Sequence, residues 1–266
     1  MKKIKLYWWR GEGATDSSKR NFGDYLSPMI VEMLSGKEVI HSHPKHADML
    51  AIGTILPVEK KAKGLIFKRR LHIWGSGTDR CNRQFSDRHH YHAVRGALSR
   101  NQIEGDKGDI YLGDPGLLAD RLVKSNSVPK KYEVGVIAHY VDQSDPRLPA
   151  LLSKKNVKKI NVFDPVDQVL QQIQECDIII SSSMHGLIVA DSFGIPNRRL
   201  VLSQGLISDY KFGDYYSAFG INEPPPLSPE SVINNGFTSY SVSEGYARPR
   251  LEEIKAALEK AFPTSL

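Results

Sequence analysis

The residues best suited to chemistry lie in the stretch SSSMHG at 181–186. It follows DIII at 177–180, an apolar run typical of a buried strand, and leads directly into a helical pattern. Ligands of open α/β sheets bind outside the carboxyl ends of strands, and free N–H groups at a helix start attract anions. The serines add hydroxyl donors, and His185 suits proton transfer near neutral pH. The stretch predicts an anion site with a proton donor; the alternative is capping serines and a structural histidine.

Alternating strand and helix patterns must position this stretch. Strand-like runs are found at 5–9, 48–53, 71–75, 91–94, 133–140, 156–163, 177–183 and 197–203. Helical patterns are found at 22–36 with Gly36 as its stop, from 96–97, after Asp114–Pro115, at 164–177 with Asp164 as N-cap before Pro165, at 185–194 closed by Gly194, and at 248–262. This repetition indicates parallel sheets covered by helices on both faces.

We therefore expect an α/β protein of two Rossmann-like, doubly wound domains in a GT-B-like arrangement. The N-terminal domain would span 1–125 and the C-terminal domain 130–225, with the polar stretch 124–132 as linker. Residues 226–266 would form a crossing segment and a closing helix. The active site would lie in the cleft between the domains.

Composition narrows the class of protein. Of 266 residues, 40% are hydrophobic and 25% charged, which fits a folded globular chain and excludes disorder as its main state. No apolar run is long enough to span a bilayer, and MKKIKLYWWRGEG lacks a signal-peptide core, so a cytoplasmic location is expected. Cys81 and Cys176 have neither disulfide nor metal spacing. A net charge of +6 favours an anionic ligand or surface.

Four short elements follow one another in a recognisable order: NFGD at 21–24, AVRGALS at 93–99, LGDPGLL at 112–118 and SSSMHGLIVADSFGIP at 181–196. In this order and spacing they resemble the motifs of the polysaccharide pyruvyl transferase family. The resemblance implies transfer of the pyruvyl group of phosphoenolpyruvate to two hydroxyls of one sugar residue, giving a cyclic ketal and phosphate. The acceptor would be a surface glycan, often linked to polyprenyl diphosphate. Phosphoenolpyruvate would be a co-substrate, with no cofactor.

The resemblance also implies roles for particular residues. Arg95 would bind the carboxylate or phosphate of the donor as a planar fork, with the N-terminal domain as the acceptor side. His185, on the donor side, would contact phosphate and act as general acid. Asp24 would orient or deprotonate an acceptor hydroxyl, or else cap the helix that follows; for Asp114 we favour capping. The rest of the donor site would be Ser182, Ser183, Met184 and Gly186.

One position departs from the family pattern. The family usually has an arginine two residues before the donor-site histidine, and this chain has Ser183 there. Either Ser183 and the helix N-terminus suffice, or another cation replaces the arginine. Lys211 is a candidate for that replacement, and a solvated loop lysine is the alternative reading.

Other segments suggest weaker functions. EKKAKGLIFKRR at 59–70 could rest on an anionic membrane at its inner face, or be a solvated loop. The histidines at 41–46 and 89–92 lack partners at ligand spacing, so no metal is expected, and no nucleic-acid motif occurs. Two alternative functions stay open: a nucleotide-sugar glycosyltransferase of the same architecture, and a non-catalytic phosphosugar-binding relative.

Overall fold

The computed structural model describes residues 3–62, 70–124, 128–203, 205–236 and 242–266. Its strands form a six-stranded sheet in the order β2-β1-β3-β4-β5-β6 and a four-stranded sheet in the order β10-β9-β7-β8. All strand pairs in both sheets are parallel. The strands are β1 Ile4–Tyr7, β2 Val39–His41, β3 Met49–Leu50, β4 His72–Trp74, β5 His90–Val94, β6 Tyr111–Leu112, β7 Tyr132–Ile137, β8 Val157–Lys159, β9 Cys176–Ser181 and β10 Asn197–Arg199. The expected α/β class with parallel sheets is confirmed.

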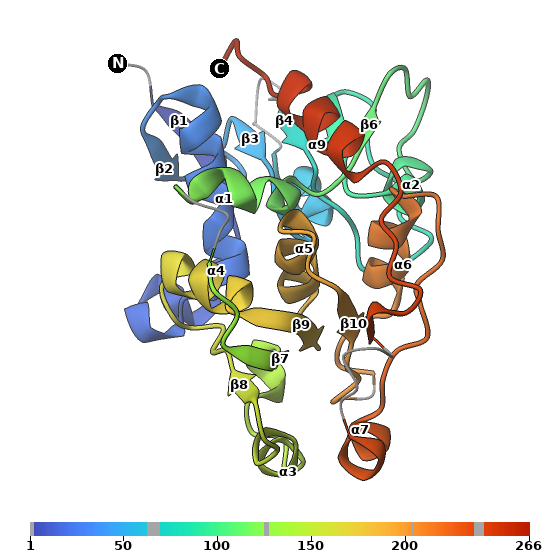
Figure 1. Cartoon of the computed structure of the whole chain (residues 1–266). Helices are drawn as coiled ribbons and strands as arrows, with labels where there is room; N and C mark the ends of the chain where they lie inside the picture. The colour runs from blue at the N-terminus through green and yellow to red at the C-terminus, as the bar shows by residue number, and fades with distance from the viewer. Residues whose placement is uncertain (1–2, 63–69, 125–127, 204, 237–241) are drawn as a thin grey trace.

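Helices fill the space between the two sheets. Figure 1 shows the first sheet in the upper part of the molecule and the second in the lower part, with α4 and α5 between them. The α-helices are α1 Phe22–Ser35, α2 Ala97–Arg100, α3 Leu148–Leu152, α4 Val166–Gln174, α5 Met184–Ser192, α6 Tyr210–Ser217, α7 Pro229–Asn235 and α9 Leu251–Lys260. Short 3₁₀ helices are η1 Gly11–Ala14, η2 Ser17–Lys19, η3 Leu56–Lys61, η4 Pro115–Leu122 and η5 Tyr140–Asp142.

One apolar cluster joins the two sheets. It contains Ile4 and Leu6 of the first sheet together with Ile137 and Ile179 of the second. Helix η4 contacts both α1 and α5, and α5 is buried along its whole length. Because α5 is covered on all sides, it belongs to the interior that joins the two sheets.

Local sequence signals explain how two helices begin and end. The side chain of Asn21 caps α1 by accepting a hydrogen bond from Gly23 N at 3.1 Å, and Gly36 ends the helix in the left-handed region at φ 63°. The expected stop at Gly36 is confirmed. The expected cap at Asp164 is wrong: Pro165 is the N-cap residue of α4. The carboxylate of Asp164 instead accepts from Asn161 and Gln172, at 3.0 and 3.2 Å.

The C-terminal helix packs on the first sheet, although α7 precedes it beside the second. The indole nitrogen of Trp74 on β4 donates to the carbonyl of Leu258 on α9 at 2.9 Å, and Phe262 lies edge-on to the same indole. Figure 1 shows α9 across the upper face, next to β6. The helix expected at 248–262 is confirmed, with bounds Leu251–Lys260.

The strand order places one reversal point in each sheet. In the first sheet β2 and β3 lie on opposite sides of β1, and in the second β8 and β9 lie on opposite sides of β7. Chain connections therefore diverge between β1 and β3, and between β7 and β9. Crevices open outside the carboxyl ends of such strand pairs, which is where α/β proteins bind ligands.

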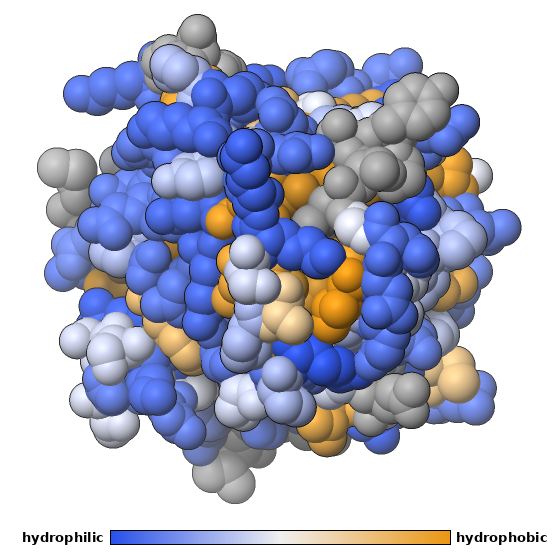
Figure 2. Space-filling view, turned by 60° about the horizontal axis from the view of Figure 1, so that its bottom comes forward, coloured by the Kyte–Doolittle hydropathy of each residue, from blue (hydrophilic) through white to orange (hydrophobic). Residues whose placement is uncertain are grey.

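The face shown in Figure 2 is largely hydrophilic. On the face shown in Figure 2, charged and polar side chains surround a group of hydrophobic ones near the centre. In the described part of the chain, no helix has the length and apolar character needed to cross a membrane.

Candidate active site

The two reversal points face one cavity of about 440 Å³. Its walls include the segments at the carboxyl ends of four strands: Tyr7 and Trp9 at β1, Thr54 and Ile55 after β3, His139 and Tyr140 after β7, and Ser183 and His185 after β9. The fold thus brings the SSSMHG stretch of one half and the NFGD turn of the other to a shared site. A cleft between two sheets, each at its reversal point, is where the fold predicts a ligand.

His185 meets the NFGD turn directly. A Cβ atom on Gly23 would lie 2.2 Å from Nδ1 of His185, so the absence of a side chain at residue 23 makes room for the imidazole. Nε2 of His185 is buried without a hydrogen-bond partner in the described part of the chain. Burial, with the nearby charges of Lys211 and Arg95, lowers the pKa of His185 to about 3. The imidazole is therefore neutral. Among the described residues, no hydrogen bond fixes its Nε2 in a structural role.

The three serines before His185 have different tasks. Ser181 Oγ accepts from the amide of Ser183 and donates to backbone carbonyls, which fixes the turn from β9 into α5. Ser182 donates to the carboxylate of Asp142 at 2.5 Å and accepts from the amide of His139. Ser183 is the N-cap residue of α5, makes no capping side-chain bond, and lines the cavity. The first amides of α5 therefore remain available to an anion.

Gly186 and Met184 support this arrangement in different ways. Met184 lines the cavity and is almost fully buried. A Cβ atom on Gly186 would lie 2.4 Å from Ser181 Oγ, so this glycine lets α5 pack closely on the end of β9.

Lys211 lies on α6 and lines the cavity, so the alternative of a solvated loop lysine is wrong. Burial, followed by the charges of Arg95 and Arg199, lowers the pKa of Lys211 to about 8, against the opposing effects of Asp24 and Asp142. No ion pair among the described residues holds its ammonium group. It is a cation directed at the cavity and available to an anionic ligand.

Asp24 lies in the first turn of α1 and also lines the cavity. Because Asn21 is the cap, the carboxylate of Asp24 is not used for that purpose. Burial raises the pKa of Asp24 to about 7, although Lys211 acts in the opposite direction. A carboxyl group with this pKa can both give and take a proton near neutral pH.

Arg95 lies behind the cavity wall. Its side chain is fully buried, with Nε donating to Asp214 Oδ2 and Nη1 to Thr54 Oγ1, both at 2.9 Å, and Nη2 to the carbonyl of Thr78 at 2.5 Å. Thr54 lines the cavity and Arg95 does not. Direct contact between Arg95 and a donor therefore stays a prediction that this arrangement does not display.

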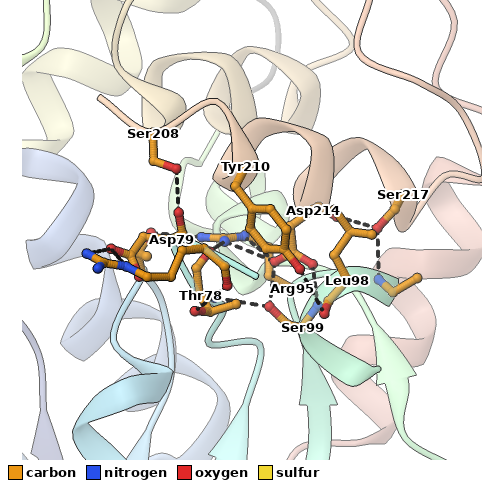
Figure 3. Close-up of polar contacts among 12 residues, drawn as sticks. Thr78, Asp79, Arg95, Leu98, Ser99, Ser208, Tyr210, Asp214 and Ser217 are labelled. Atoms are coloured by element: carbon orange, nitrogen blue, oxygen red, sulfur yellow. Dashed lines mark hydrogen bonds and ion pairs between the residues drawn. The ribbon is translucent and has the colours of Figure 1, made fainter. Parts of the chain in front are cut away.

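The Arg95–Asp214 pair fastens α6 to the first half of the chain. Asp214 also accepts from the amide and hydroxyl of Ser99, at 2.7 and 2.6 Å, and Ser217 Oγ accepts from the amide of Ala97 at 2.8 Å. Figure 3 shows these side chains meeting between α6 and the segment that follows β5. A Cβ atom on Gly96 would overlap the carbonyl oxygen of Asp214, so only glycine allows this approach. The junction sets where α6 presents Lys211.

Comparison with known proteins decides the family. The sequence profile described as polysaccharide pyruvyl transferase matches residues 53–202, more than half of the chain. The chain belongs to the polysaccharide pyruvyl transferase family. An uncharacterized protein, L143, of Acanthamoeba polyphaga mimivirus is 33% identical over 157 residues, which cover 55% of this chain and 54% of that protein. The succinoglycan biosynthesis protein ExoV of Rhizobium meliloti is 23% identical over 232 residues, which cover 86% of this chain and 69% of ExoV.

The LGDPGLL motif of this pyruvyl transferase family member lies at the start of η4. In LGDPGLL, Asp114 caps η4 by accepting from the amide of Gly116 at 2.9 Å, as expected. Burial raises the pKa of Asp114 to about 6, and the residue does not line the cavity. A Cβ atom on Gly116 would lie 2.9 Å from Ile188, so this motif packs η4 on α5.

Sequence reasoning missed several residues of the cavity. His139 lines the cavity, and burial lowers its pKa to about 3. It follows β7 in the same way that His185 follows β9, and this position after a strand could have identified it from the sequence. Trp9 and Tyr140 gave no such signal, because an exposed aromatic looks like a core residue in a sequence.

Two further predictions concern the histidine clusters and the basic stretch at 59–70, of which Lys61 lines the cavity. Among the described residues, no group of three or more histidine, cysteine, aspartate or glutamate side chains could hold a metal ion. His72 and His92 stack with ring centroids 5.1 Å apart. The basic stretch at 59–70 lies largely outside the described residues, and so does part of the linker at 124–132.

Proposed function

We propose that the protein transfers the pyruvyl group of phosphoenolpyruvate to two hydroxyls of a sugar in a surface polysaccharide or its lipid-linked precursor. Family membership supports a transferase with a polysaccharide acceptor. The observation that carries the finer proposal is the shared cavity, where Lys211, His185 and the start of α5 converge. We also propose that the halves 1–125 and 130–225 act as GT-B-like domains, with 226–266 as the closing segment.

The donor anion has three sources of attraction in this cavity. The ammonium of Lys211 supplies a charge, and the first amides of α5 supply donors and the positive end of the helix dipole. Arg95 lies behind Thr54 with its charge paired to Asp214, and we propose that it acts on the donor through the Thr54 hydroxyl, to which its Nη1 donates. Ser183 then replaces the usual arginine only as part of the helix start, while Lys211 supplies the missing charge.

The reaction requires one proton to move at each of two steps. In the first, an acceptor oxygen bonds to C2 of phosphoenolpyruvate, its hydroxyl proton is lost, and C3 gains a proton to become a methyl group. In the second, the other hydroxyl oxygen bonds to C2, loses its proton, and the C2–O bond to phosphate breaks. The net products are the cyclic ketal and hydrogen phosphate, with no proton gained or lost overall.

Asp24 and His185 are the groups placed to move these protons. Asp24, with a pKa of about 7, takes the proton of an acceptor hydroxyl. His185 is neutral in the empty cavity, and a bound dianion favours its protonated form, so it becomes an acid only when the donor is present.

A ligand panel tests the proposal. Phosphoenolpyruvate should raise the melting temperature of the purified protein, and a nucleoside diphosphate should not, because only a ligand of the native state stabilises it. Incubation with phosphoenolpyruvate and carrier-linked sugars should then add one pyruvyl ketal by mass spectrometry. Stabilisation by nucleoside diphosphates alone would favour a glycosyltransferase, and donor binding without any product would favour a non-catalytic relative.

Contact with a membrane remains a separate proposal. Co-sedimentation with anionic vesicles at low salt would support it, and failure to co-sediment would remove it.

A further inference from the structure

We call the cavity of about 440 Å³, where we propose that the donor binds, the donor cavity. A second cavity, of about 220 Å³, adjoins it. Trp9, Asn21, Asp24 and Tyr140 line both cavities. Asp24 therefore lies on the boundary between them, and a group held in the second cavity reaches the donor beside this carboxylate. The chemistry of the second cavity's own walls indicates what that group is.

Two aromatic side chains are left open at this boundary. Trp9 is 50% exposed and Tyr140 is 42% exposed, although large aromatic side chains are normally covered. The neighbouring Trp8 is only 7% exposed and packs edge-on against Tyr25 and His41. One tryptophan of the pair thus holds the end of β1 in the core, and the other is free to contact a ligand.

The loop after β1 fixes the indole of Trp9. Gly11 has φ +49°, and a Cβ atom on it would lie 3.2 Å from Nε1 of Trp9. The edge of the indole therefore lies beside the backbone of the loop at Gly11, while half of the side chain stays exposed. A ring held in one orientation loses little conformational entropy when a ligand packs on it.

The remaining walls are polar and carry both signs of charge. Glu12 and Lys19 line the cavity, and the ammonium of Lys19 lies 5.6 Å from the ring centre of Phe163, which also lines it. Gln143 donates through Nε2 to the carbonyl of Ala138 at 2.7 Å, which leaves its Oε1 as an acceptor. Arg10 also lines the cavity, so two basic side chains face two carboxyl groups, Glu12 and Asp24, and the wall has no excess of either sign that would select an ion. The hydrogen-bonding groups disfavour a purely apolar ligand.

We propose that this second cavity binds the sugar residue that accepts the pyruvyl group, an inference that rests on the proposed function. A pyranose ring has C–H groups that pack on aromatic faces and hydroxyls that meet charged and amide groups at its edge. The cavity is smaller than the ~300–1,000 Å³ of sites for drug-sized ligands, so it holds one monosaccharide. The two reacting hydroxyls point past Asp24 to the donor cavity.

A binding experiment tests the site without relying on catalysis. The chain has three tryptophans, of which Trp8 and Trp74 are buried and Trp9 is exposed. Titration with methyl hexopyranosides of gluco, galacto and manno configuration should give a saturable change in tryptophan emission with at least one of them. The Trp9→Phe variant should lose that change. An absence of any Trp9-dependent change across the three sugars overturns the proposal.

A kinetic experiment separates this proposal from the proposed function. Trp9→Ala should raise the acceptor KM at least tenfold and leave the phosphoenolpyruvate KM within twofold, while Trp9→Phe should restore most of the loss. Met29→Ala is the matched control, because Met29 is 37% exposed and lines neither cavity. Wild-type activity with an unchanged acceptor KM in Trp9→Ala overturns the sugar site alone. A wild-type protein that never uses phosphoenolpyruvate overturns the proposed function, and the emission titration then decides the sugar site.

Discussion

At the scale of single residues, burial exchanges the protonation states that Asp24 and His185 would have in water. The carboxyl of Asp24 has a pKa of about 7 and keeps its proton in slightly acidic solution, whereas the imidazole of His185, at about 3, is without one. Both shifts come first from desolvation, which disfavours the charged form of each group. In slightly acidic solution the cavity therefore holds a protonated carboxyl group at Asp24 and an unprotonated ring nitrogen at His185.

The raised pKa of Asp24 makes stability depend on pH. An unfolded aspartate titrates near ~3.9, so the folded protein binds the extra proton between that pH and about 7, and stability falls as pH rises through this window. Asp24→Asn should raise the melting temperature by several degrees above pH 7 and leave it unchanged near pH 4. Glu32→Gln, an exposed carboxylate on the same helix, is the control. Equal shifts at both pH values would contradict the buried carboxylate, and calorimetry across the pH range measures them.

We propose that Lys211 supplies the positive charge where the family arginine is missing. Lys211→Ala should abolish most of the stabilisation by phosphoenolpyruvate and weaken donor binding at least tenfold, because a bound anion would lose its nearest charge. Lys211→Arg should keep part of the stabilisation by phosphoenolpyruvate. Isothermal calorimetry measures both, with the exposed Lys260→Ala as control. Donor affinity that is the same in Lys211→Ala and wild type would remove this residue from the site.

At the scale of elements, helix α6 matters because it carries Lys211 and is fixed by one buried ion pair. Removing one partner of a buried pair costs ~3–5 kcal/mol, since the other charge is left uncompensated. Asp214→Asn should therefore lower the free energy of unfolding by about this amount and also weaken donor binding. A variant as stable as wild type in urea unfolding would refute the fastening role.

A double variant separates structure from charge at the same junction. Arg95→Met with Asp214→Leu should recover much of the lost stability, because apolar residues can replace a buried pair. If donor binding stays weak in this folded protein, the charge of Arg95 acts on the donor. If binding returns to the wild-type level, Arg95 only positions α6.

Features that are set by residues adjacent in the chain could be predicted from the sequence. The turn from β9 into α5 and the stop at Gly36 follow from local patterns, as does the cap at Asp114. The partner of Arg95 could not be predicted, because Asp214 lies 119 residues away and contacts it only after α6 has docked. Helix α6 is not among the helices predicted from the sequence, since its polar positions hide the buried Phe212 and Tyr216.

At the scale of the whole molecule, we expect the shared apolar cluster to make the two halves unfold together. Leu258 on α9 is fully buried in this cluster, so Leu258→Ala should cost ~2–5 kcal/mol through the cavity it leaves. Differential scanning calorimetry should show one transition at a lower temperature, with donor affinity retained because Leu258 does not line the donor cavity. Two separate transitions would mean that the halves are independent.

The packing of α9 also bears on how the protein is made. Synthesis delivers β4 well before the segment 251–262, yet the indole of Trp74 donates to the carbonyl of Leu258. While the ribosome is still extending the chain, the first sheet exposes an apolar face that later residues will cover. We therefore expect the nascent chain to be prone to aggregation until α9 has emerged, however early its first strands have formed.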